Sequence, residues 1–299
     1  MSATSVLYDA PGSRAKRRNV LYTVLFVVLC ALAAWWVLAA MADKGQLASE
    51  KWSPFATDSQ AWTTYLLPGL GKTLTAAGLS IVIALPFAAL LGIGRLSDHA
   101  WVRGPVGVVV EFFRSIPVLL MMLFANQAYA EYSTISSDIR PMYAVVTGLV
   151  LYNASVMAEI VRAGILSLPF GQTDAAKAIG MRKGQTMTSV LLPQGVTAML
   201  PALVSQLVVI VKDTALGGAL LGLPELLSQS RTITANYGAN TIATFTVIAV
   251  IYIALNSSIT ALAGRLEQRL RRAKRSTGAV LGAGDAQELN TPGHGSGAG

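Results

Sequence analysis

The stretch "TIATFTVIAVIYIALNSSITALA", residues 241–263, contains no charged side chain and only a few polar ones. A helix needs about 20 predominantly apolar residues to cross the hydrocarbon core of a bilayer, and this stretch is long enough. The whole chain of 299 residues is 53% hydrophobic and 13% charged, whereas soluble domains carry about 25% charged residues. The sequence therefore predicts an α-helical membrane protein.

Five more apolar stretches are candidate spans, namely 19–41, 73–93, 106–129, 142–165 and 195–216. The first follows "RAKRR", but its apolar run exceeds the roughly 7 to 15 residues of a signal peptide, so we predict an uncleaved span. Pro86, Pro117 and Pro201 lie inside predicted spans. Each removes a helix hydrogen bond, and we expect local kinks there. The predicted fold is all-α, with six transmembrane helices.

Lysines and arginines gather on one side of the predicted membrane. With an even number of spans, both termini share a side. Basic clusters at 14–18 and 265–275 flank the first and last spans, and the loops around 95–103 and 177–183 on that side are also basic. Because basic loops stay in the cytoplasm, we predict cytoplasmic termini and a cell-membrane location. The net charge of +8 then reflects topology and contact with anionic membrane lipid, and we expect no binding of nucleic acid.

The stretch "QTDAAKAIGMRKGQTMTSVLLPQG", residues 172–195, is a polar loop between the fourth and fifth predicted spans. Thr173 or Asp174 is suited to cap the first turn of a short helix, and alanines favour helix after it. Gly180 is suited to end that helix in a left-handed C-terminal cap. Small side chains allow another surface to approach closely. The pattern leaves two readings open, a docking helix or an ordinary alanine-rich loop.

This loop resembles the cytoplasmic signature of permease subunits of binding-protein-dependent ABC importers. The signature is Glu-Ala-Ala, three residues, Gly, nine residues, then Ile-x-Leu-Pro. The matching positions here are Asp174, Ala175, Ala176, Gly180, Val190, Leu192 and Pro193. Two of them depart from the signature, with Asp in place of Glu and Val in place of Ile. The segments "EFFRSIPVLLMMLF" (111–124) and "VKDTAL" (211–216) are similar to the polar amino-acid branch of these permeases.

The resemblance covers about residues 65–265, the expected permease core. Three segments lie outside it, namely the first span, a basic tail over 1–18, and a tail over 266–299 that is first basic and then Gly-rich. We expect the 266–299 tail to be disordered. It implies that the loop forms a coupling helix that docks into separate ATP-binding subunits, which hold ATP and Mg. It also implies a second permease, identical or homologous, two ATP-binding subunits and an extracytoplasmic substrate-binding protein. Glutamate, glutamine or another polar amino acid is the expected substrate. Buried cations favour an acidic or neutral amino acid, and a basic one stays open.

Ionisable residues inside predicted spans are costly and are candidates for function. Glu111 and Arg114 are three residues apart, as are Glu159 and Arg162, so each pair is expected to meet on one helix face. A structural pairing explains most of these charges. Arg114, Glu159 and Lys212 are also candidates for lining a substrate pathway, because a zwitterion needs both signs of charge.

Four uncharged polar residues are weaker candidates for the pathway, since hydrogen bonds between helices explain them equally well. They are Asn126, Gln127, Asn153 and Gln206.

Other site classes find little support in the sequence. "GLGKT", residues 69–73, resembles the end of a phosphate-binding loop, but Leu66 stands where that pattern requires glycine. Cys30, His99 and His294 have no neighbours that suggest a catalytic set or a metal site, so we expect neither an enzyme nor a bound metal. The remaining alternatives are a transporter driven by an ion gradient, and a membrane scaffold or channel subunit.

Overall fold

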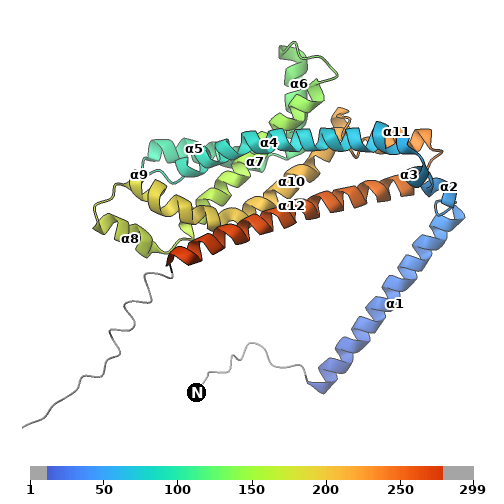
Figure 1. Ribbon diagram of the computed structural model, residues 1–299, viewed down its shortest axis with the longest axis horizontal. Coiled ribbons are helices and arrows are strands. Elements are labelled where there is room, and N and C mark those ends of the chain that lie inside the picture. The colour runs from blue at the N-terminus through green and yellow to red at the C-terminus, as the bar shows by residue number, and fades with distance from the viewer. Residues whose placement is uncertain (1–11, 279–299) are drawn as a thin grey trace, which may run out of the picture.

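The computed structural model of the protein describes residues 12–278, and every regular element in that range is a helix. Figure 1 shows their arrangement. The elements are α1 (Ser13–Asp43), α2 (Ser49–Trp52), α3 (Pro54–Thr57), η1 (Ala61–Leu66), α4 (Leu67–Gly94), α5 (Ala100–Ser115), α6 (Val118–Tyr132), α7 (Arg140–Leu166), α8 (Phe170–Ala178), α9 (Lys183–Thr186), η2 (Met187–Leu191), α10 (Leu192–Leu221), α11 (Gln229–Asn236) and α12 (Thr241–Gly278). The all-α prediction is confirmed for this range.

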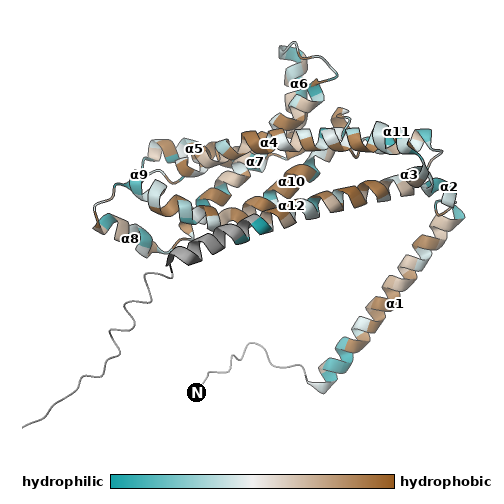
Figure 2. Ribbon diagram, viewed as in Figure 1, coloured by the Kyte–Doolittle hydropathy of each residue, from teal (hydrophilic) through white to brown (hydrophobic). Residues whose placement is uncertain are grey.

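Five helical stretches in the described range are long and apolar enough to cross a membrane. They are Ser13–Asp43, Ala61–Gly94, Arg140–Leu166, Lys183–Leu221 and Thr241–Arg265. Five of the six predicted spans are confirmed in this way, although the helices extend past the predicted ends. Figure 2 shows the apolar residues along these long helices.

The third predicted span is not one straight helix. Its two parts, α5 and α6, meet at an angle of 97°. Pro117 lacks an N–H group, and the residue before a proline avoids helical backbone angles. Ile116 accordingly adopts an extended conformation, with φ −92° and ψ 130°. The expected local kink at Pro117 is therefore a full break, whereas Pro86 and Pro201 lie inside the uninterrupted helices α4 and α10.

Small residues allow the helices of the core to pack closely. The largest cluster of buried side chains joins α4, α6, α7 and α10 and includes four alanines of α4, namely Ala76, Ala77, Ala84 and Ala88. At the α4–α7 crossing, a Cβ added to Gly92 would lie 2.8 Å from the carbonyl oxygen of Ala158. At the α6–α7 crossing, a Cβ on Gly148 would lie 2.8 Å from the backbone nitrogen of Met122. Such crossings are typical of helices packed in membranes.

Helix α1 stands apart from the rest of the bundle (Figure 1) and has no buried residue. The chain that follows α1 is nevertheless attached to the start of α12. The Gln46 side chain donates to Ala239 O at 3.4 Å, and the Ile242 N–H donates to Gln46 Oε1 at 3.4 Å. The Tyr237 hydroxyl donates to Asp58 Oδ2 at 2.6 Å. These bonds fix residues 46–58 at the end of the bundle opposite α8.

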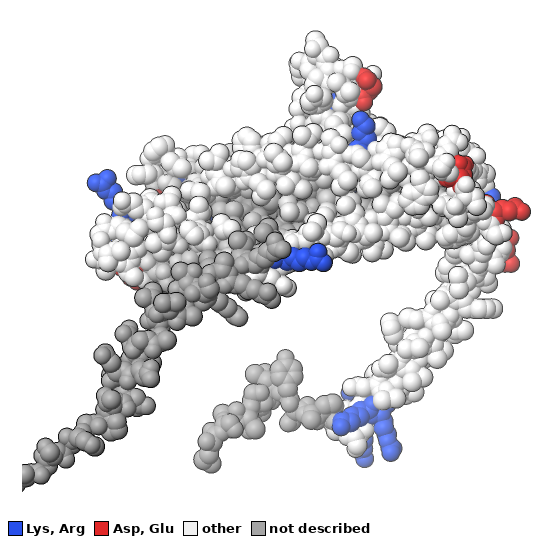
Figure 3. Space-filling model, in the orientation of Figure 1, with Lys and Arg blue, Asp and Glu red and all other residues white. Residues whose placement is uncertain are grey.

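The ends of the chain differ from the predicted tails. Helix α1 begins at Ser13, so the end of the predicted 1–18 tail is helical. Helix α12 continues to Gly278, so the tail predicted to be disordered from 266 starts as helix. Residues 1–11 and 279–299, which include His294, lie outside the described residues. In Figure 3, basic side chains gather at the start of α1 and acidic ones near α2 and α3.

Candidate functional site

The 172–195 loop contains a true helix, and its C-terminal end is the one that the sequence predicts. Helix α8 ends in a Schellman motif around Gly180, whose φ is +80°. The Gly180 N–H donates to Lys177 O at 2.9 Å, and the Met181 N–H donates to Ala176 O at 3.0 Å. Glycine is favoured at this position because a Cβ would strain a left-handed backbone.

The start of α8 was predicted in the wrong place. The helix begins at Phe170 after Pro169, so Thr173 and Asp174 lie inside it and cap nothing. Pro169 has φ −57° and ψ 133°, which places the chain outside the helix just before the first turn. Thr173 and Asp174 are therefore not capping residues, because the helix begins at Phe170, about one turn before them.

Helix α8 has one buried edge and a broad exposed face. Ala176 is buried, and the Gln194 side chain of α10 donates to Gln172 Oε1 at 3.2 Å, so this edge rests against the bundle. At 3.6 residues per turn, the centre of the opposite face carries only short side chains. They are Gly171, Asp174, Ala175 and Ala178, all exposed.

Two large apolar side chains flank this face, one at each end of α8. Phe170 is 84% exposed and Ile179 is 78% exposed. We call the face formed by Phe170, Gly171, Asp174, Ala175, Ala178 and Ile179 the α8 face. A surface with short side chains at its centre and a large apolar side chain at each end is suited to bind another protein.

Leu192 and Pro193 have a structural role at the base of the loop. Pro193 follows the π-helical turn η2, which continues into α10 with helical backbone angles at Leu191 and Leu192. Leu192 packs against a buried cluster of Val161, Ile165 and Met199, which joins α7 to α10. The loop helix is therefore attached to a rigid part of the bundle.

The α9 segment is also tied to the turn between α4 and α5. The Lys183 ammonium donates to Leu96 O at 3.0 Å and forms an ion pair with Asp98. The hydrogen bond from Lys183 holds the pKa of Asp98 below its ordinary value. The loop after α7 and the turn after α4 thus meet at one end of the bundle.

Five charged side chains form a network just inside that end. Arg95 binds Glu111 of α5 at 2.9 Å and Glu159 of α7 at 2.8 Å. Arg114 lies 3.5 Å from Glu111, and Arg162 lies 2.7 Å from Glu159. Both predicted pairs three residues apart are confirmed. The sequence did not single out Arg95, which joins the two pairs from the end of α4.

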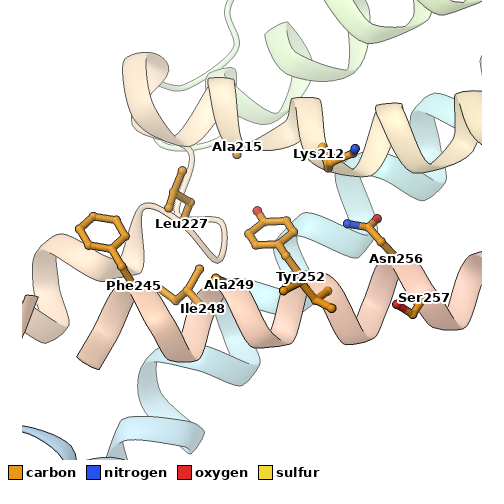
Figure 4. A pocket seen from close by; sticks show the side chains of 10 residues that line it. Lys212, Ala215, Leu227, Phe245, Ile248, Ala249, Tyr252, Asn256 and Ser257 are labelled. Atoms are coloured by element: carbon orange, nitrogen blue, oxygen red, sulfur yellow. The ribbon is translucent and has the colours of Figure 1, made fainter. Parts of the chain in front are cut away.

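The three predicted pathway residues do not come together. Arg114 and Glu159 belong to the charge network, whereas Lys212 lies on α10, where its side chain is exposed in a groove beside α12. The groove has a volume of about 720 Å³ and is shown in Figure 4. Of the polar candidates, Gln206 donates to Asn153 Oδ1 at 2.6 Å, which confirms the interpretation as a helix–helix hydrogen bond for this pair.

Glu225 is a buried carboxylate that the sequence analysis missed. It follows α10 and is fully buried. Its carboxylate accepts hydrogen bonds from the N–H groups of Leu227 at 2.8 Å and Ser228 at 2.7 Å, and from the Tyr252 hydroxyl at 2.9 Å. It lies outside every predicted span, so the search for charges in spans did not reach it.

The segment "GLGKT" forms no phosphate-binding loop. Residues 69–73 lie within the helix α4, and Thr73 is buried. A phosphate-binding loop presents backbone N–H groups to the ligand, whereas these groups lie within a helix.

Comparison with known proteins identifies the family. The family described as binding-protein-dependent transport system inner membrane component matches residues 84–272. The glutamate transport system permease protein GluD of Corynebacterium glutamicum is 48% identical over 234 residues, which cover 77% of this chain and 84% of GluD. The probable glutamine ABC transporter permease protein GlnP of Bacillus subtilis is 31% identical and covers 71% of this chain and 96% of GlnP.

A solved structure gives the same result. The crystal structure of an amino acid ABC transporter with histidines has a TM-score of 0.60 at 25% identity, and the match covers 70% of this chain and 95% of that one. The chain therefore belongs to the family of inner membrane components of binding-protein-dependent transport systems.

Proposed function

We propose that this chain forms the transmembrane pathway of an ATP-driven amino-acid importer and that the α8 face docks into a separate ATP-binding subunit. In the proposed complex it works with a second permease, two ATP-binding subunits that hold ATP and Mg, and an extracytoplasmic binding protein. Both termini and α8 lie in the cytoplasm. Family membership supports this assignment, and the relatives named above suggest glutamate or glutamine as substrate.

The observation that carries the proposal is the α8 face. Phe170 and Ile179, at the two ends of α8, are large apolar side chains that are 84% and 78% exposed. They project from a short helix whose other edge is fixed by Ala176 and Gln172. Apolar side chains held outward on a rigid element are typical of a protein–protein contact.

The contacts behind α8 supply a route for mechanical coupling. A displacement of α8 would be transmitted to α10 through the Gln172–Gln194 hydrogen bond. A displacement of α9, which follows α8, would be transmitted to the 95–98 turn through the contacts of Lys183 with Leu96 and Asp98. Arg95 then connects that turn to α5 and α7. Movement of the loop would therefore displace several helices together.

The pathway residues stay a prediction. Arg114 forms an ion pair with Glu111, and Glu159 forms ion pairs with Arg95 and Arg162, so these contacts account for both side chains without substrate. Lys212 lies in the groove beside α12, and no ion pair found among the described side chains explains the presence of its charge there.

Substrate-stimulated ATP hydrolysis in proteoliposomes tests the coupling. We expect L-glutamate and its binding protein to stimulate hydrolysis by the complex that co-purifies with this chain. Ala175→Arg should abolish the stimulation, because a long cation occupies the shallow centre of the α8 face. Ala175→Ser is the matched control and should keep coupling, since it leaves the centre small.

Two results would contradict the proposal. One is a co-purified complex without ATPase activity, which would favour a transporter driven by an ion gradient. The other is full coupling in Ala175→Arg, which would show that α8 is not the contact.

A further inference from the structure

A groove between α4 and α7 opens on the side of the bundle, at the end opposite α8. It has a volume of about 540 Å³. Its two long walls are formed by one stripe of α4, namely Lys72, Thr75, Leu79 and Ile83, and by Met142 and Val146 of α7. Leu79 is 46% exposed and Ile83 is 39% exposed, so the groove is open along the outside of the bundle.

The groove is charged at one end. Lys72 directly precedes the apolar stretch 73–93, and Asp138 lies two residues before the start of α7 at Arg140. Tyr143, in the first turn of α7, also lines the groove. Tyrosine is enriched where membrane proteins pass from hydrocarbon to water. The charged end therefore lies at the membrane surface, which is extracytoplasmic in the proposed topology.

The rest of the groove is apolar over the thickness of one lipid leaflet. Lys72 and Ile83 are eleven residues apart on α4, or about 16 Å along the helix axis. Half of a hydrocarbon core is about 15 Å thick. The Thr75 hydroxyl donates to Gly71 O within the helix, and the other residues of the long walls below Lys72 are apolar. An acyl chain of one leaflet would fill this length.

The two charges at the end of the groove are of opposite sign and are not paired with each other. Neither Lys72 nor Asp138 forms an ion pair with a residue in the described range 12–278. A hydrogen bond from Ser136 lowers the pKa of Asp138, so its carboxylate is ionised at neutral pH. A lysine ammonium binds phosphate oxygens, and a carboxylate accepts hydrogen bonds from an ammonium group. The groove therefore offers one contact of each sign to a headgroup.

We infer that this groove binds a phosphatidylethanolamine molecule, whose phosphate contacts Lys72, whose ammonium group contacts Asp138 and whose acyl chain lies along the apolar walls. The headgroup of this lipid carries one charge of each sign, as the end of the groove does, so the four charges cancel. A soluble ligand would leave the apolar length of the groove unfilled. The inference goes beyond the proposed function, because lipid binding requires neither transport nor ATP hydrolysis.

Native mass spectrometry of the purified complex, titrated with phosphatidylethanolamine in detergent, tests the inference. We expect saturable binding that weakens about threefold or more in Lys72→Gln, because the ion pair with the phosphate is lost. Lys72→Arg keeps the charge and should retain most of the affinity. Lys44→Gln is the matched control, since it changes an exposed lysine at the same end of the molecule that does not line the groove, and it should bind as the unmodified chain does.

Other headgroups test the contact with Asp138. Phosphatidylcholine has a trimethylated ammonium group without N–H donors, so it should bind more weakly than phosphatidylethanolamine. Phosphatidylglycerol has no ammonium group and should also bind more weakly. Asp138→Asn should remove the preference for phosphatidylethanolamine over phosphatidylcholine, whereas Lys72→Gln should weaken the binding of both lipids.

A large side chain in the groove tests where the acyl chain lies. Leu79→Trp places an indole at the apolar wall and should weaken the binding of phosphatidylethanolamine. Leu74→Trp is the matched control, because Leu74 is an exposed leucine of the same helix that does not line the groove. It should leave the binding unchanged.

Four outcomes would overturn the inference. The first three are no saturable binding of phosphatidylethanolamine by the unmodified complex, equal affinities in Lys72→Gln and Lys44→Gln, and tighter binding of phosphatidylglycerol than of phosphatidylethanolamine. The fourth is dissociation of the complex on size-exclusion chromatography in Leu79→Trp but not in Leu74→Trp, which would assign the groove to a contact with a neighbouring subunit.

Discussion

At the scale of single residues, the molecule stabilises buried charge by surrounding it with donors. Glu225 is the clearest case, because two backbone N–H groups and the Tyr252 hydroxyl point at its carboxylate. Gly218 makes room for it, since a Cβ there would lie 1.9 Å from Glu225 Oε1. The carboxylate thereby joins the turn after α10 to α12.

Thr73 extends this arrangement to α4 and gives a testable prediction. Its hydroxyl oxygen accepts the Leu226 N–H at 3.1 Å, and the residue is fully buried. Thr73→Val keeps the shape but leaves that N–H without a partner, so we expect the free energy of unfolding to fall by about 1–3 kcal/mol. Thermal unfolding of the detergent-solubilised protein measures the loss.

Thr75→Val is the control for this substitution. Thr75 is exposed, and its hydroxyl donates to Gly71 O in its own helix. Its replacement should change stability by less than about 0.5 kcal/mol, as is usual at the surface. Equal effects of the two substitutions would mean that the bond to Leu226 contributes nothing.

Sequence spacing predicts contacts within a helix but not contacts between helices. The pairs Glu111–Arg114 and Glu159–Arg162 follow from a separation of three residues. Arg95 is 16 residues from Glu111 and meets it only because α4 and α5 fold back on each other. Glu225 likewise stands out as a buried, hydrogen-bonded carboxylate only in the folded structure, where Thr73 of α4 and Tyr252 of α12 contact it.

At the scale of elements, glycines decide how closely helices approach. Gly148 of α7 faces the backbone of Met122 in α6 at the crossing of these helices. An added Cβ would lie 2.8 Å from the Met122 nitrogen and 3.0 Å from its Cα, and backbone atoms cannot rotate away as a flexible side chain can.

We therefore expect Gly148→Ala to lower the free energy of unfolding by about 1–3 kcal/mol, the usual range for overpacking. Gly78→Ala is the control, because a Cβ there meets no atom within 4 Å. Alanine has the higher helix propensity, so the control should be neutral or stabilising by up to about 1 kcal/mol. Apparent melting temperatures in detergent compare the two, and a melting temperature for Gly148→Ala at or above that of the unmodified protein would contradict this account of the crossing.

Local sequence signals located elements better than they located element ends. Gly180 correctly marks the end of α8, because a left-handed cap is a requirement of the backbone itself. The predicted start of α8 at Thr173 or Asp174 is wrong, since the helix begins at Phe170 after Pro169, which makes no side-chain capping hydrogen bond. Pro117 is recognisable as a disturbance, but proline alone does not distinguish an uninterrupted helix, as at Pro86, from the 97° break between α5 and α6.

At the scale of the whole molecule, apolar runs predict the order of the long helices because burial in lipid requires about 20 apolar residues per span. They do not predict how the helices pack. Helix α1 is as apolar as the core helices, yet it has no buried residue, whereas α7 is buried over much of its length. That difference depends on small residues such as Gly92 and Gly148, which appear in the sequence only as scattered glycines.

The central claim is that the α8 face binds an ATP-binding subunit in the cytoplasm, and site-specific cross-linking tests it most directly. The chain has one cysteine, Cys30, so a Cys30→Ala background allows single new thiols to be placed. Ala178→Cys lies at the centre of the α8 face, and Ser136→Cys lies in the exposed segment after α6, which the proposed topology puts outside the cell. We predict that Ala178→Cys cross-links to the ATP-binding subunit of the assembled complex and that Ser136→Cys does not. A thiol at position 178 that reacts from outside the cell, or never cross-links to that subunit, would contradict the account.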